Sequence, residues 1–461
     1  MESCDMSVVR IRQFRMADCL LSKMCSKGIA AVIGGILIHL TLGNLYSFGN
    51  MMTYMASYMH IRVDSSIDYG NFIWVNSITT AAQGCFMVFG GLLEKKVGPK
   101  ITCFVGCSLL SAGIMLTHYT IEVSLFAVTM TYGLLSGLGI SLSYVTPLAC
   151  GMKWYPDRKG FINGMIVAGF GLGALGSTNF QTMYLNPDNL PPEKDGYFKD
   201  PDLLNRVPGV FISLGVIFLV MQYLGCLLLS KPRNDHHCWQ QQEGESLLVS
   251  SEIENTEESV PISTAFLTDV DLKPMEMIRN KTFYLFWLIY FFNTIAIGYI
   301  NAMYKSFGLT FISDDHFLAV IGSLAAIFNA VGRVCWGKLM DKTSFRIAMR
   351  LLALMFAVLF ATLPLTRFMG KGGFAIWVWM IFFTFSGTFV LMPTVIEKAF
   401  GSQYYSANYG LLFTSQTVSG PLVAALNHLM LNAVGYTGCF LSISAVVSLS
   451  FILTFIVPNG L

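Results

Sequence analysis

Long apolar segments, each of membrane length, constrain the fold of this chain more than any other feature. Apolar and aromatic residues make up 54% of the 461 residues, and only 12% are charged. A soluble domain carries roughly 25% charged residues, so this composition indicates a protein that crosses a membrane repeatedly. Hydropathy predicts about twelve helical spans. They are 28–51, 71–93, 101–119, 122–150, 161–183, 208–230, 283–304, 317–338, 347–366, 374–396, 407–427 and 435–457.

One polar, acidic interruption divides the spans six and six. It contains many Asp and Glu residues and no long apolar run, which is typical of a flexible linker. We therefore predict an all-α polytopic membrane protein with about twelve transmembrane helices in two six-helix bundles. The predicted parts are a cytosolic N-terminal tail at 1–27, an N-terminal bundle at 28–230, an acidic cytosolic linker at 231–281, a C-terminal bundle at 282–458 and a tail at 459–461.

The loops between spans differ in their basic residues, and this difference predicts the orientation. Lys and Arg gather in the loops that follow the second, fourth and eighth spans. These residues are Lys95, Lys96, Lys100, Lys153, Arg158, Lys159, Lys338, Lys342 and Arg346. Basic loops stay in the cytosol, so we expect both termini and the linker there as well. The sequence leaves open whether the membrane is the plasma membrane or that of an organelle.

An arginine, Arg333, lies inside the apolar segment 321–338. Near the centre of a bilayer an arginine costs about 2.5–3.5 kcal/mol on the insertion scale, so it normally faces a partner, a cavity or an anionic ligand. Its side chain could instead reach the interface, because Lys338 follows only roughly 7.5 Å further along the helix. Spacing alone leaves both interpretations open.

Helical phase places Arg333 on one face together with small residues and a single amide. Gly322, Ala326, Asn329, Arg333 and Gly337 follow one another at steps of three and four residues. A second polar stripe, with Gln83 at its end, lies on the span 71–93. It consists of Asn76, Thr80 and Gln83. We expect the two stripes to face each other across a pseudo-twofold axis, where transporters built from repeats bind their substrates.

A short turn motif occurs once in each half. The segment Gly91-Leu-Leu-Glu94-Lys95-Lys96-Val-Gly98-Pro-Lys100 is answered by Gly337-Lys-Leu-Met-Asp341-Lys342. This repeat resembles the signature of the major facilitator superfamily. The resemblance implies that the acidic residue of the turn caps or pairs across the cytosolic helix ends and stabilises one conformation. The first copy has Lys95 where aspartate is usual, with Glu94 beside it, which weakens the expectation of a link in that half.

Five further segments stand out in the sequence. They are Gly43-Asn-Leu-Tyr46-Ser-Phe48, Gly137-Leu-Gly139-Ile-Ser-Leu-Ser-Tyr144-Val-Thr146-Pro147, Lys153-Trp154-Tyr155-Pro156-Asp157-Arg158-Lys159-Gly160, Phe328-Asn329-Ala-Val-Gly332-Arg333 and Asn408-Tyr409-Gly410-Leu-Leu-Phe413-Thr414-Ser415-Gln416. Together they resemble the oxalate:formate antiporter family, which includes carriers of monocarboxylates such as pyruvate. The resemblance implies that Arg333 faces the cavity and binds a carboxylate. The substrate-binding residues we predict are Arg333, Asn329, Gln416, Tyr144, Tyr46, Gln83, Tyr409 and Trp379.

One departure from that family bears on the charge of the substrate. The oxalate exchangers of that family have a lysine at the position in the predicted span 407–427 where this chain has Gln416. A doubly charged anion would then meet one cation in a site of low dielectric constant, which is costly. We therefore predict a secondary transporter of small monocarboxylates resembling pyruvate, lactate or formate. An exchanger of dicarboxylates such as oxalate and a transporter-like membrane sensor without flux are the alternatives.

Other classes of function find little support in the sequence. No nucleophile elbow, P-loop or H-E-x-x-H motif occurs, so we do not expect an enzyme, a catalytic residue, a metal or a cofactor. The expected partners are a small organic anion, a coupled proton or counter-anion and the lipid bilayer, without nucleic acid, for a monomeric protein. His39, on the first span, is interpreted as a packed histidine rather than a proton carrier, although histidine can titrate at mildly acidic pH.

Overall fold

The computed structural model describes residues 26–193, 196–232, 271–312 and 314–458, and this part of the chain is helical and without strands, as predicted. In the first half the elements are a helix at 26–42, η1 (Gly43–Ser47), α2 (Phe48–Arg62), α3 (Ile73–Val97), α4 (Pro99–Thr120), α5 (Leu125–Val128), η2 (Thr129–Leu135), α6 (Ser136–Trp154), η3 (Pro156–Arg158), α7 (Lys159–Leu185) and α8 (Pro201–Leu228). In the second half they are α10 (Pro274–Ile278), α11 (Lys281–Gly308), α12 (Asp315–Lys342), α13 (Phe345–Thr362), η4 (Leu363–Phe368), α14 (Gly370–Ser386), α15 (Thr388–Phe400) and α16 (Tyr405–Leu453). The predicted tails and most of the predicted linker lie outside the described residues.

Eleven helices of the described chain are long and apolar enough to cross a membrane. Each coincides with a predicted span, and the remaining predicted span, 407–427, lies within α16. The first span is longer than predicted, because the chain stays helical from Ser26 to Arg62 through η1. Hydropathy finds only the apolar part of a helix, whereas the helix itself continues through the more polar end of α2.

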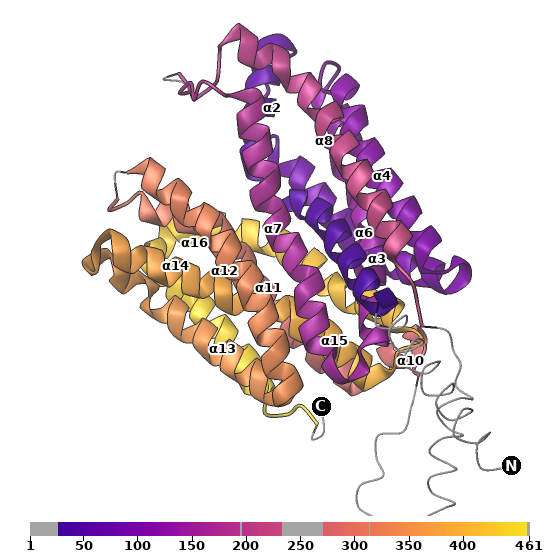
Figure 1. Ribbon diagram of the computed structural model, residues 1–461. Helices are drawn as coiled ribbons and strands as arrows, with labels where there is room; N and C mark the ends of the chain where they lie inside the picture. The colour runs from indigo at the N-terminus through magenta and orange to yellow at the C-terminus, as the bar shows by residue number, and fades with distance from the viewer. Residues whose placement is uncertain (1–25, 194–195, 233–270, 313, 459–461) are drawn as a thin grey trace, which may run out of the picture.

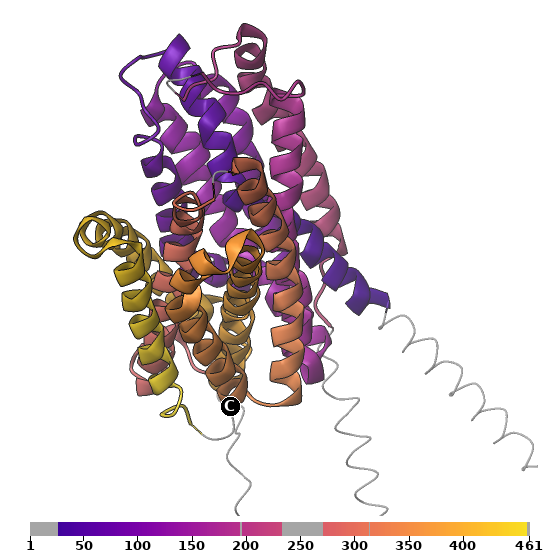
Figure 2. The same ribbon diagram turned by 90° about the vertical axis from the view of Figure 1, so that its left-hand side faces the viewer.

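The last helix, α16, consists of two arms that meet at Gly435. The φ of Gly435 is 62°, in a region that favours glycine because it has no Cβ. The first arm carries the predicted site residues Tyr409 and Gln416, and the second arm returns along the molecule to its C-terminal end. Figure 2 shows this second arm, in yellow, at the edge of the second half.

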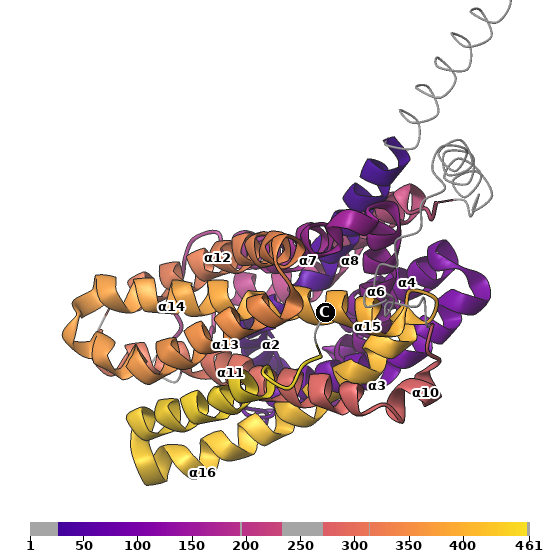
Figure 3. The ribbon, with the colours of Figure 1, turned by 90° about the horizontal axis from the view of Figure 1, so that it is seen from below.

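The helices form two groups that correspond to the two halves of the chain. The groups meet near the end of the molecule where the N and C labels lie, and they diverge toward the opposite end (Figure 1). Seen from below, the two groups lie side by side, with α7 of the first half next to α12 of the second (Figure 3).

Two pairs of helices join the halves, α7 with α12 and α3 with α16. In the first pair Gly160 lies against Gly337, and Gly164 lies against the backbone of Arg333. In the second pair Gly91 lies against Ala407 in the same way. Glycine lets backbones approach closely enough for extensive van der Waals contact, which replaces the hydrophobic effect inside a bilayer. Each pair therefore forms an antiparallel seam along the pseudo-twofold axis.

Candidate anion site and gate

Arg333 lies in the interior, between the two halves. Only 1% of its surface is exposed, and its guanidinium lies 5.8 Å from the Phe170 ring centroid and 5.4 Å from that of Phe389. Its Nη1 donates a hydrogen bond to Val167 O of α7, at 2.5 Å. Its Nε has no hydrogen-bond partner among the described residues, and none of their carboxylates forms an ion pair with it. The structure therefore places this side chain in the interior, at the cavity described next.

A small cavity adjoins Arg333 and draws its walls from both halves. Its lining residues are Leu45, Tyr46, Gln83, Tyr144, Phe170, Arg333, Phe389, Phe413 and Gln416. Its free volume is about 10 Å³, which is about the space that one water molecule needs. A carboxylate larger than water would therefore require some of these side chains to move apart.

Aromatic rings form most of the wall. The ring centroids of Tyr144 lie 5.6 Å from Phe170 and 5.9 Å from Phe413, so these three rings connect the halves. Tyr46 packs edge-on against Phe170, at 5.0 Å. Tyr46 is 44% exposed, whereas Arg333 is almost fully buried. Tyr46 is the only residue of the cavity lining that is exposed.

Two amide side chains, Gln83 and Gln416, complete the cavity. Gln83 is buried, and its Oε1 has no hydrogen-bond partner in the described part of the chain. Gln416 Oε1 accepts a hydrogen bond from the Tyr290 hydroxyl, at 3.3 Å. A guanidinium offers paired donors that match a carboxylate, and amides and phenols add hydrogen bonds. The arrangement is chemically suited to a small anion with an apolar body.

The cavity brings together five of the eight predicted binding residues, from η1, α3, α6, α12 and α16. They are Tyr46, Gln83, Tyr144, Arg333 and Gln416.

The other three predicted residues, Asn329, Tyr409 and Trp379, are not among the lining residues. Asn329 Nδ2 donates to Phe382 O, at 3.3 Å, and Trp379 Nε1 donates to Ile321 O, at 3.1 Å. Tyr409 packs between Tyr405 and Phe413. These side chains support the helices around the cavity instead of lining it.

The helices that carry the two polar stripes pack against different neighbouring helices. Gln83 belongs to α3, which packs along α16, whereas Asn329 belongs to α12, which packs along α7. The stripes therefore face each other only where Gln83 and Arg333 both line the cavity. Asn329 instead faces Gly171 of α7 and bonds to Phe382 O.

Four lining residues are not among the eight predicted ones: Leu45, Phe170, Phe389 and Phe413. Phe170 lies in the glycine-rich α7, three residues after Val167, whose carbonyl accepts the hydrogen bond from Arg333. Helical spacing therefore puts Phe170 on the face of α7 that is turned toward Arg333.

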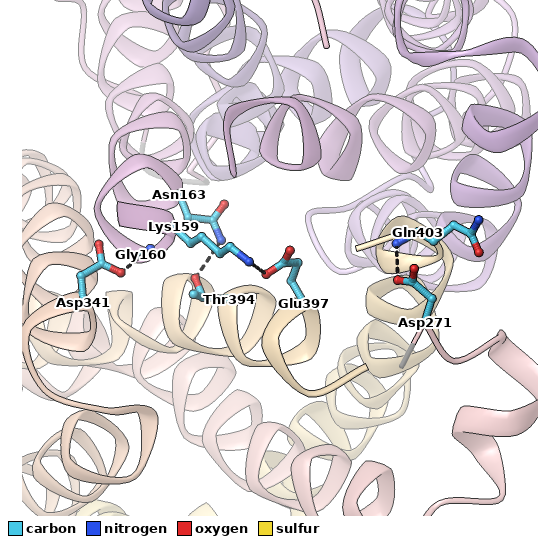
Figure 4. A network of polar contacts seen from close by, with 8 residues as sticks. All are labelled: Lys159, Gly160, Asn163, Asp271, Asp341, Thr394, Glu397 and Gln403. Carbon is cyan, nitrogen blue, oxygen red and sulfur yellow. Dashed lines mark hydrogen bonds and ion pairs between the residues drawn. The ribbon is translucent and has the colours of Figure 1, made fainter. Parts of the chain in front are cut away.

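At the end where the halves meet, Asp341 caps a helix of the opposite half. Its Oδ1 accepts from Gly160 N at 2.8 Å and its Oδ2 accepts from Phe161 N at 2.6 Å (Figure 4). Both donors belong to the first turn of α7, where backbone N–H groups lack partners within the helix and the helix dipole favours an anion. The second copy of the turn motif thus joins α12 to α7.

Two further contacts join α7 to α15. Lys159 Nζ forms an ion pair with Glu397 Oε2, at 2.6 Å, and Asn163 Nδ2 donates to Thr394 Oγ1, at 3.1 Å (Figure 4). Within the second half, Gln403 N donates to Asp271 Oδ1, at 2.8 Å, which fastens the segment before α10 to the turn before α16.

The first copy of the motif also links the halves, through Glu94 and Lys95. The Ser406 hydroxyl donates to Glu94 Oε2, while Glu94 Oε1 pairs with Lys231 Nζ at 2.9 Å. Lys95 Nζ lies 3.3 Å from the centroid of the Tyr404 ring. The link that the sequence made doubtful in this half is therefore present, and it uses Glu94 in place of the usual aspartate.

The remaining motif residues shape the helix ends. Gly98 has a φ of 86°, which lets α4 start directly after α3, and Lys342 is the last residue of α12. We call the set of contacts between the halves at this end the gate. It consists of Glu94, Lys95, Lys159, Gly160, Phe161, Asn163, Asp341, Thr394, Glu397, Tyr404 and Ser406.

Among the described residues, no group of three His, Cys, Asp or Glu side chains is arranged to hold a metal ion. The groups of the cavity that can bind a ligand are a guanidinium, two amides and two phenols.

Comparison with known sequences identifies similar transporters. The family model of the Major Facilitator Superfamily matches residues 35–425. Apicoplast pyruvate carrier 1 of Toxoplasma gondii is 27% identical over 472 residues, covering 89% of this chain and 85% of that protein. The oxalate:formate antiporter of Oxalobacter formigenes is 23% identical over 373 residues, covering 80% of this chain and 78% of that protein.

Solved structures of transporters share the fold. The Escherichia coli fucose:proton symporter superposes with a TM-score of 0.67 at 14% identity, covering 94% of this chain and 98% of that one. A proton:xylose symporter gives a TM-score of 0.67 at 11% identity, covering 95% of this chain and 96% of that one. At these identities the likeness concerns the fold.

Proposed function

The chain belongs to the Major Facilitator Superfamily, and we propose that it is a secondary transporter of small monocarboxylates that works by alternating access. It is an integral, multi-pass membrane protein of a family of transporters. In this proposal the cargo crosses chemically unchanged, so the protein needs no catalytic group.

The observation that carries the proposal is Arg333, a buried cation beside a cavity whose walls come from both halves. Burying an arginine there is costly, and its Nε has no hydrogen-bond partner among the described residues, while its Nη1 donates to a backbone carbonyl. A bound carboxylate would supply the missing negative charge and two acceptors. The pyruvate carrier and the oxalate:formate antiporter among the relatives support a carboxylate as the cargo.

The preference for one negative charge rests on the number of cations in the cavity. Arg333 is the only cationic side chain among the lining residues, and Gln416 stands where oxalate exchangers are expected to have lysine. A second carboxylate group would lie among aromatic rings without a counter-charge, which is unfavourable in a medium of low dielectric constant. Pyruvate, lactate and formate satisfy this limit, whereas oxalate does not.

The gate supports alternating access. In this conformation the halves are joined at one end and diverge toward the other (Figure 1). Since the gate lies among the basic loops, we place it, the termini and the linker in the cytosol, in a plasma or organelle membrane. Transport then requires the gate to open while the halves close at the opposite end.

Uptake by purified protein in liposomes tests the proposal. Labelled pyruvate, lactate, formate and oxalate are offered separately, with protein-free liposomes as the control. We expect saturable uptake of the monocarboxylates and little uptake of oxalate. Uptake of oxalate without any monocarboxylate would instead support a dicarboxylate exchanger, and saturable binding without flux would support a sensor.

A further inference from the structure

A second ionisable side chain, His39, lies directly behind the wall of the cavity. It is in the helix at 26–42 and is 0% exposed. Its ring centroid lies 5.1 Å from that of Tyr144 and 6.5 Å from that of Phe170, and both of these rings line the cavity. The imidazole is therefore one side chain away from the space in which the anion would bind.

The two nitrogens of this imidazole differ in their surroundings. Nδ1 lies 3.0 Å from Gly35 O, so in the neutral ring Nδ1 carries the hydrogen and donates it to that carbonyl. Nε2 is buried and has no hydrogen-bond partner among the described residues. A buried polar atom without a partner is costly, and here it is the atom that would accept a proton.

Few charged or titratable groups face His39. Arg333 of α12 opposes a positive charge on the ring, whereas the backbone groups of Gly35 and of Tyr144 favour it. From α7, Phe170 and Gly169 lie beside the ring. With the cavity empty, the positive charge of Arg333 opposes a second positive charge in this dry region. A carboxylate on Arg333 reduces that repulsion, because its negative charge compensates the guanidinium.

We propose that His39 binds the proton that is transported together with the carboxylate. When the anion binds Arg333, Nε2 takes up one proton, and the neutral imidazole becomes an imidazolium. On release, the carboxylate and the proton leave on the same side, and the imidazole becomes neutral again. This inference rests on the proposed function of the same cavity and makes the protein a proton–monocarboxylate symporter.

Charge balance gives the physical reason for this coupling. The empty site carries the single positive charge of Arg333, and a bound monocarboxylate alone would cancel it. With one proton on His39, the loaded site again carries one positive charge. The empty and loaded forms then undergo the conformational change with equal charge in opposite directions, so a complete cycle moves no net charge across the membrane.

Substitution of His39 by asparagine separates proton coupling from transport. The amide nitrogen of asparagine occupies the position of Nδ1 and can still donate to Gly35 O, but the side chain does not titrate. In liposomes, the wild type should accumulate labelled pyruvate when the outside is more acidic, up to about tenfold per pH unit of gradient. His39→Asn should lose this accumulation while still exchanging labelled for unlabelled pyruvate at equal pH, which also shows that it is folded.

His118 offers a matched control. Its Nδ1 also lies near a backbone carbonyl, Pro208 O at 2.9 Å, but it does not adjoin the cavity. His118→Asn should accumulate pyruvate like the wild type. Undiminished accumulation by His39→Asn would overturn the inference.

Proton uptake by the wild type gives a measurement that needs no variant. Adding pyruvate to the detergent-solubilised protein in weak buffer, with a pH indicator, should remove about one proton per binding site. Binding without proton uptake would refute the role of His39 and leave the carboxylate site intact. If neither binding nor transport of any monocarboxylate occurs, the proposed function fails, and this inference fails with it.

Discussion

The cavity and the gate both lie between the two halves, but their polar groups are satisfied to different degrees. In the gate, each oxygen of Asp341 and of Glu94 has a partner, and Glu397 is paired with Lys159. In the cavity, Arg333 Nε and Gln83 Oε1 have no partner among the described residues. The gate thus stabilises this conformation by itself, whereas the cavity holds unused hydrogen-bonding groups that a ligand can satisfy.

One pair of helices connects these two regions. Arg333 and Asp341 lie on α12, roughly 12 Å apart along the helix, and both bond to α7. A change at the cavity that moves α12 relative to α7 therefore also acts on the gate.

Replacing Arg333 in the cavity by lysine should reduce transport more than any other substitution proposed below. Lysine keeps the charge but loses the paired donors, at a cost of about 2–3 kcal/mol. The efficiency of pyruvate uptake should therefore fall about 30- to 150-fold. Arg350→Lys is the control, because Arg350 bonds to Thr454 O and lies outside the cavity. Equal uptake by both variants would remove Arg333 from the binding site.

Asp341→Asn tests the gate. Asparagine keeps one acceptor oxygen but loses the charge at the start of α7, which should weaken the closed gate by about 1–2 kcal/mol. Hydrogen exchange at the amides of Gly160 and Phe161 should then speed up about 5- to 30-fold. Pyruvate affinity should change much less than in the arginine variant. Unchanged exchange would mean that Asp341 does not hold the gate.

Gln416→Lys should change the selectivity of the cavity and leave the gate intact. A second cation would compensate a second carboxylate group, so uptake of oxalate relative to pyruvate should rise about tenfold. Gln403→Lys adds the same charge near the gate, outside the cavity lining, and should not alter this ratio. If both variants leave the ratio unchanged, the number of cations does not set the charge of the substrate.

Glu94→Gln should have the smallest effect. Glutamine can still accept the bond from Ser406, and the lost ion pair with Lys231 is partly exposed and worth about 1 kcal/mol or less. Exchange of the amides at the start of α16 should therefore speed up less than about fivefold. A larger effect than that of Asp341→Asn would reverse the proposed ranking of the two motif copies.

The sequence predicted the spans better than the site, for physical reasons. Apolar length reveals a membrane helix, and helical phase reveals which residues share a face, but neither gives the depth along the bundle. Tyr409 and Gln416 lie two turns apart on one face of α16, yet only Gln416 lines the cavity.

Trp379 shows a second limit of sequence patterns. The predicted span 374–396 is divided between α14 and α15 by Gly387. The cavity receives Phe389 from α15, while Trp379 of α14 packs against Phe328. The positions of such side chains depend on tertiary packing, which a single sequence does not reveal.

The hydrogen bond from Arg333 to Val167 O has a consequence for how binding could trigger movement. The guanidinium keeps donors, such as Nε, that no described residue uses, but a charged carboxylate is a stronger acceptor than a carbonyl and would draw the guanidinium toward itself. An arriving anion would thus replace the hydrogen bond between α12 and α7 by a hydrogen bond to itself. Occupancy of the cavity then loosens the seam that must separate before the gate can open.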